Sequence, residues 1–119
     1  MATIHDIEAT LAARFPRETT RFHWGVLAKD VVLPALEEVS VALRNLDQDA
    51  TATNNGDEVV LSVAVEGFEH APSIVFNGKF DPVVITFGTT RQPVALEYLG
   101  SDVVLDYANQ FLRGLYSVA

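Results

Sequence analysis

The chain has 119 residues, of which 49% are hydrophobic and 20% are charged. Domains usually span about 100–150 residues, so we expect residues 1–119 to form a single α+β domain with a buried core. Its 16 acidic residues outnumber its 8 basic ones, and the formal net charge is −8 at pH 7. Binding to nucleic acid or to an anionic membrane is therefore not expected, because phosphate contacts need clustered Lys and Arg.

The absence of cysteine excludes disulfides, thiolate nucleophiles and Cys-ligated metal sites. The first 15 residues contain His5, Asp6 and Glu8, and they lack the basic start and apolar run of a signal peptide. The apolar runs are only a few residues long, whereas a membrane-spanning helix needs about 20. These features predict a cytoplasmic protein without a membrane segment.

The first predicted element is a helix from Ile4 to about Phe15. Apolar residues recur there at spacings of three and four, which places them on one face: Ile4, Ile7, Leu11 and Phe15. Thr3 is a suitable N-cap. Pro16 is expected to end the helix, because the residue before a proline is disfavoured in the α conformation.

A connector is predicted from Pro16 to Ala28, with Gly25 as its hinge. It combines basic and aromatic residues in a way that is typical of binding surfaces, and we expect it to be ordered. A second helix follows from about Lys29 to Leu46. Because Pro34 is best tolerated in a first turn, the regular helix is expected to begin close to that residue.

Residues 47–57 are polar and end in the turn-forming string Asn54-Asn55-Gly56-Asp57. The hydrophobic period then changes to two, which predicts strands at Glu58–Glu66, Ser73–Phe76, Pro82–Phe87 and Pro93–Leu99. Between the second and third of these, Asn77-Gly78 favours a type I′ turn. The face that packs on the helices is expected to bury Leu61, Val63, Ile85, Phe87 and Leu96.

A last helix is predicted from Asp102 to about Tyr116, with Ser101 as its cap. The predicted fold is α+β, with two N-terminal helices, a four-stranded antiparallel meander and a C-terminal helix in two layers. This element order resembles that of several small α+β groups, including secretion-chaperone-like and immunity-protein-like domains. The resemblance is one of order alone and transfers no functional residues.

No catalytic or metal-binding constellation is found. His5, His23 and His70 are not at ligand spacings, and the chain has no GxSxG, GxGxxG or P-loop motif. Asp47–Glu58 places oxygen-bearing side chains at the alternating positions of a calcium loop. It lacks the required glycine and a following helix, so it is interpreted as a polar turn. We therefore assign no catalytic residue, metal or cofactor.

Two groups of residues are predicted to contribute to binding. The first is the basic and aromatic group of the connector: Arg17, Arg21, His23 and Trp24. The second is the pair Glu97 and Tyr98 on the last predicted strand, where Glu97 is expected to share a sheet face with Glu66. In that position the two carboxyl groups would be candidates for acid–base chemistry.

Two hypotheses of function follow from the sequence. The first is a non-enzymatic protein-interaction or chaperone-like module, which is expected to form a homodimer and to bind other proteins. Its dimer surface is predicted to be the C-terminal helix or the second face of the sheet, because both carry surplus apolar residues. The alternative is a small-molecule-binding protein or an enzyme with a pocket between sheet and helices.

Overall fold

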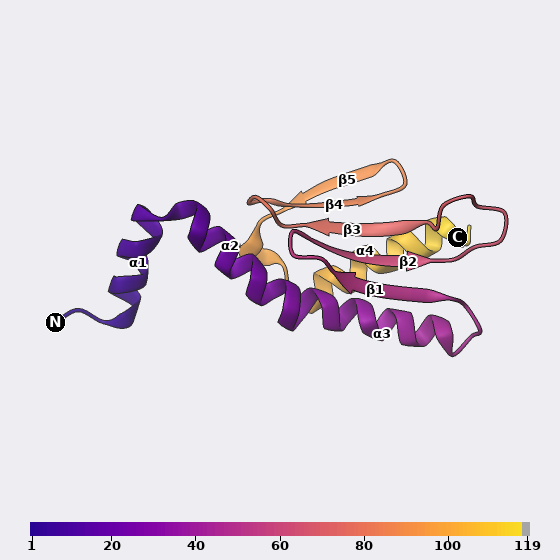
Figure 1. Ribbon diagram of the computed structural model, residues 1–119, viewed down its shortest axis with the longest axis horizontal. Coiled ribbons are helices and arrows are strands. Elements are labelled where there is room, and N and C mark those ends of the chain that lie inside the picture. Colours follow the sequence, from indigo (N-terminus) through magenta and orange to yellow (C-terminus); the bar gives the residue numbers. More distant parts are fainter. Residues whose placement is uncertain (118–119) are drawn as a thin grey trace.

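The computed structural model describes residues 1–117 and has the predicted α+β class (Figure 1). Its strands form one antiparallel meander in the order β1-β2-β3-β4-β5, so the sheet has five strands instead of the predicted four. The helices are α1 (Ile4–Arg14), α2 (Pro16–Leu27), the π-helical turn η1 (Ala28–Val32), α3 (Leu33–Arg44), the 3-10 turn η2 (Leu96–Tyr98) and α4 (Ser101–Leu115). The strands are β1 (Ala50–Asn54), β2 (Glu58–Val63), β3 (Ser73–Asn77), β4 (Val83–Phe87) and β5 (Thr90–Val94).

The core lies between one face of the sheet and the helices α3 and α4. On β2, buried and partly exposed residues alternate along the whole strand, as the two-residue period predicts. The expected burial of Leu61, Val63 and Ile85 is confirmed. Phe87 and Leu96 are partly buried and pack against the same core.

Strand β1 lies inside the segment that the sequence indicated to be a polar turn. Only Ala50 is fully buried, while Thr51 and Thr53 face outwards on this edge strand. Ala52 pairs with Leu61 of β2. The strand was missed because its inward positions carry alanine, which contributes too little hydrophobicity to give a visible alternation.

The prediction of a strand at Pro93–Leu99 is wrong. Phe87 pairs with Thr90, so the β4–β5 hairpin closes over two residues, and Gly88 supplies the positive φ that its turn needs. Strand β5 therefore begins earlier in the sequence than predicted. Residues 96–98 then form η2, so Glu97 and Tyr98 are not on a strand.

The predicted connector is a helix. α2 runs through η1 into α3, so that residues 16–44 form one continuous helical rod (Figure 1). Gly25 does not act as a hinge. The backbone N–H of Leu33 donates to the carbonyl oxygen of Ala28, five residues earlier, and this wider turn accommodates Pro34 without breaking the helix.

α4 begins one residue earlier than predicted, with Gly100 and not Ser101 as its N-cap. Its apolar stripe faces the core, where Val104, Ala108 and Phe111 are buried. The Phe111 ring meets that of Phe87 edge to face, with centroids 6.3 Å apart. The stripe expected to serve self-association is therefore largely consumed by intramolecular packing.

The chain is elongated, with extents of 60 × 26 × 25 Å. Its radius of gyration is 16.4 Å, whereas a compact chain of this length would have about 13.5 Å. The excess arises because α1 and the first turns of α2 project from one end of the molecule (Figure 1). Among residues 1–117, every helix is too short or too polar to span a bilayer.

Candidate interaction surface

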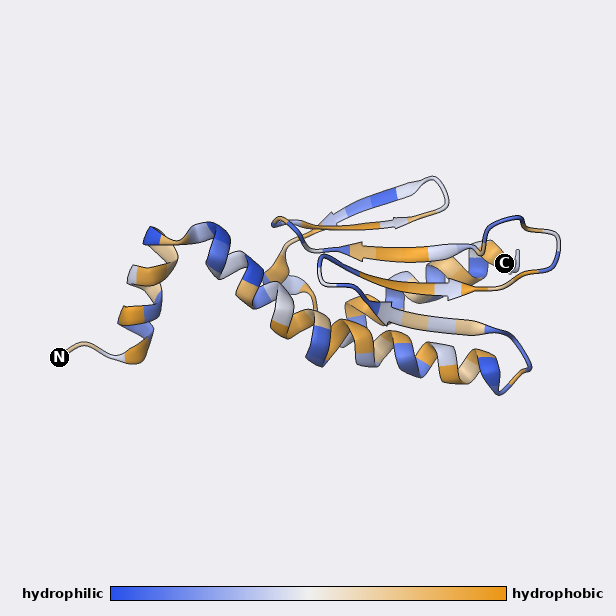
Figure 2. Ribbon diagram, in the orientation of Figure 1, coloured by the Kyte–Doolittle hydropathy of each residue, from blue (hydrophilic) through white to orange (hydrophobic). Residues whose placement is uncertain are grey.

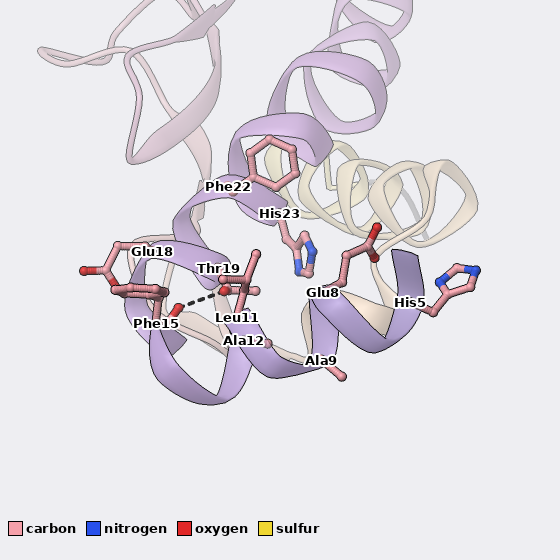
Figure 3. A pocket seen from close by; sticks show the side chains of 10 residues that line it. All are labelled: His5, Glu8, Ala9, Leu11, Ala12, Phe15, Glu18, Thr19, Phe22 and His23. Atoms are coloured by element: carbon pink, nitrogen blue, oxygen red, sulfur yellow. Dashed lines mark hydrogen bonds between the residues drawn. The ribbon is translucent and has the colours of Figure 1, made fainter. Parts of the chain in front are cut away.

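Helix α1 is a well-formed helix in its own right. The Asp6 N–H donates to Thr3 Oγ1 at 3.3 Å, and the Thr3 N–H donates to Asp6 Oδ2 at 2.8 Å, which completes a capping box. The predicted end of the helix before Pro16 is confirmed. At the bend, Thr19 Oγ1 donates to the Phe15 carbonyl oxygen at 2.7 Å (Figure 3).

The apolar stripe of α1 is exposed along its whole length. Its four members have exposed fractions of 61% for Ile4, 49% for Ile7, 48% for Leu11 and 43% for Phe15. No residue of α1 is buried, and the element it contacts most is α2. Figure 2 shows this run of hydrophobic residues on the projecting helix. A monomer thus leaves a complete amphipathic face without a partner.

A groove of about 650 Å³ lies between α1 and the first turns of α2 (Figure 3). Leu11, Ala12 and Phe15 line it from the α1 side, and Phe22 and His23 line it from the α2 side. His23 and Glu8 both point into the space between the helices. We call α1, this groove and the exposed residues Phe22 and Val26 of α2 the arm surface.

Charge is distributed unevenly along the arm surface. The first twelve residues contain the acidic Asp6 and Glu8 but no Lys or Arg. The bend that follows carries three arginines and one glutamate, at Arg14, Arg17, Arg21 and Glu18. The free end of α1 is thus negative, and the bend is positive.

Trp24, one of the predicted binding residues, is 3% exposed and so contributes almost nothing to the surface. Its indole N–H donates to the Gly56 carbonyl oxygen at 2.8 Å. Its ring lies against Gly78, where any Cβ would overlap it. Gly78 does not adopt a positive φ, so it is needed for space and not for a type I′ turn. Trp24 fastens α2 to two turns of the sheet.

Three other predicted residues come together in a second groove of about 830 Å³. His23 lines it from α2, while Glu97 and Tyr98 line it from η2. Leu27, Leu96, Leu99 and Val103 add apolar walls, and Phe22 is shared with the first groove. We call this space, between α2, η2 and the start of α4, the end groove.

Arg17 and Arg21 line a separate cleft of about 630 Å³, together with Lys79 and Phe80 from the β3–β4 loop. The six predicted binding residues are therefore divided among the end groove, this cleft and the core. Glu66 lies in the β2–β3 loop, so it does not share a strand face with Glu97. The exposed Phe80 was missed, because nothing in its local pattern distinguishes it from a strand residue.

No group of three or more metal-ligating side chains comes together among residues 1–117. Comparison with known proteins gave no matching family model, no matching curated protein and no matching solved structure. The argument for function therefore depends on the surfaces described above.

Proposed function

We propose that the protein is a non-enzymatic interaction module that forms a homodimer through the arm surface. The observation that carries this proposal is the α1 stripe, in which every member is at least 43% exposed although the helix is capped and regular. Helices shorter than about 12–15 residues are marginal in water without tertiary contacts. An 11-residue helix that buries nothing therefore needs a partner to remain folded.

A second copy of the chain is the partner that best fits the charge of the arm. When two arms lie antiparallel about a twofold axis, the acidic free end of each α1 approaches the partner's arginine-rich bend. A parallel arrangement would bring like charges together. Twofold dimers are also the commonest closed assemblies of identical chains.

The expected dimer is weak and depends on concentration. Complete burial of an Ile, Leu or Phe side chain is worth about 1.5–3 kcal/mol. Covering the exposed halves of four such residues on each of two copies therefore contributes roughly 6–12 kcal/mol. Association itself costs about 4–15 kcal/mol, so the net affinity is expected in the micromolar range.

Light scattering of the wild type and one matched pair of variants tests this proposal. At about 100 µM, the wild type is expected to approach twice its 13.0 kDa mass, because this concentration lies well above a micromolar Kd. Leu11→Asp is expected to remain a 13.0 kDa particle, because it places a charge in the apolar stripe.

Val41→Asp is the control for that variant. Val41 lies on α3 and is 47% exposed, against 48% for Leu11, so the two substitutions are matched in exposure and in added charge. The control is expected to dimerise like the wild type. A wild type that stays at 13.0 kDa at 100 µM, or an equal loss of dimer in both variants, would contradict the proposal.

The end groove is the observation that favours the alternative, a small-molecule-binding protein or enzyme. A small-molecule site usually encloses about 70–90% of its ligand. Glu97 and Tyr98 are both exposed at the groove's edge, and the groove opens along the side of the molecule. This shape suits an extended or helical chain segment better than an enclosed small molecule.

A further inference from the structure

We propose that the end groove binds a basic, amphipathic segment of another protein. The inference goes beyond dimerisation, because the groove lies on α2, η2 and α4 and includes no residue of α1. It would give the protein a second binding surface.

The apolar part of the end groove is large enough for several side chains. Its volume is about 830 Å³, and its inner walls include the buried Leu99 and the partly buried Leu27, Leu96 and Val103. At its mouth, Tyr98 and Val26 are exposed. Exposed aromatic side chains beside apolar walls are typical of grooves that bind an amphipathic helix.

The charge of the end groove determines which partner fits. Asp81, Glu97 and Asp102 line it, and among the described residues no Lys or Arg does. Asp102 lies in the first turn of α4, where the helix dipole favours its negative charge. Asp81 Oδ1 accepts a hydrogen bond from the Leu96 N–H at 3.1 Å, which fixes that carboxylate beside η2. A ligand that places Lys or Arg beside its apolar residues would neutralise this rim.

The same charges disfavour the other occupants. A second copy's α1 would bring Asp6 and Glu8 towards a rim that is already acidic. Nucleic acid and anionic membranes are disfavoured for the same reason. A basic amphipathic protein segment is the class of partner that satisfies both the apolar walls and the rim.

The test is fluorescence anisotropy with two labelled peptides of about 18 residues, long enough for a helix. One has Leu and Lys at amphipathic helical spacing, and the other has Leu and Glu. The wild type is expected to bind the Leu/Lys peptide and not the Leu/Glu peptide, at physiological ionic strength. Equal binding of the two peptides would overturn the inference.

Two pairs of variants separate the groove from the general attraction of an acidic protein for a cationic peptide. Glu97→Lys is expected to weaken binding about tenfold, because it places a like charge beside the peptide. Glu38→Lys, on the exposed side of α3, makes the same change in net charge and is expected to have an effect below twofold. Equal losses in these two variants would overturn the inference.

Tyr98→Ser and Leu46→Ser form the second pair, with wild-type exposed fractions of 70% and 72%. Only Tyr98→Ser is expected to weaken peptide binding, again about tenfold, because a hot-spot aromatic contributes at least this much. Light scattering of Tyr98→Ser distinguishes the two proposals. A normal dimer with lost peptide binding supports the end groove as a separate site, whereas loss of the dimer would assign the groove to the second copy and overturn the inference.

Discussion

Helices α1 and α4 carry similar apolar stripes but have opposite fates. In α4, Val104, Ala108 and Phe111 pack onto the sheet and are buried. In α1, every member of the stripe is exposed, although the helix is capped as regularly as any in the chain. Sequence periodicity indicates that a helix has an apolar face, but it does not indicate whether that face meets its own domain or another molecule.

The difference arises from the rod formed by α2, η1 and α3. α3 contacts both the sheet and α4, so the second half of the rod belongs to the core. α2 meets the core through Trp24 and then continues past the end of the sheet. Because Pro16 ends α1 and starts α2, α1 bends away and finds no core to cover.

The largest effect is expected at the centre of the core. Phe76→Ala on β3 should lower the free energy of unfolding by about 3–5 kcal/mol, since Phe76 is completely buried and its removal leaves a cavity. Phe80→Ala, four residues later and 67% exposed, should change it by less than about 0.5 kcal/mol. Urea denaturation measures both, and similar values for the two variants would contradict the described core.

An intermediate effect is expected where the rod joins the sheet. Gly78→Ala should lower the free energy of unfolding by about 1–3 kcal/mol, because the new methyl group overlaps the Trp24 ring. Gly25→Ala should raise it by about 0.5–1 kcal/mol, since Gly25 lies in α2 with open space around it and alanine favours the helix.

Thermal and urea unfolding, followed by Trp24 fluorescence, can measure this glycine pair. Opposite signs for the two alanine substitutions are the expected outcome. If Gly78→Ala were as harmless as Gly25→Ala, the account of Trp24 as the fastening between rod and sheet would be wrong.

The sequence predicted the parts of the fold that depend on strong local patterns. The alternation of Val59, Leu61 and Val63 identified β2, and the Thr3 cap with Pro16 defined α1. It failed where the signal was weak or ambiguous. β1 buries only alanines, β5 is polar, and the aromatic residues of α2 suggested a loop because Gly25 and Pro34 concealed a continuous helix.

The candidate surfaces were harder to predict than the fold. Glu97, Tyr98 and His23 were identified singly from their residue types, but their meeting in one groove depends on η2 packing beside α2. Trp24 looked like a binding residue because aromatic and basic neighbours are typical of exposed hot spots, and only tertiary packing shows that it is buried. The exposure of the α1 stripe likewise depends on the direction of the rod.

Hydrogen–deuterium exchange of the α1 amides, measured at several protein concentrations, tests the dimer proposal most directly. The α4 amides serve as the internal reference, because their protection comes from the core of each chain and should not change on dilution. We expect residues 4–14 to be protected at about 100 µM and to exchange much faster below the micromolar Kd expected for the dimer. Exchange in α1 that is equally fast at every concentration would contradict the proposal that a second copy covers this helix.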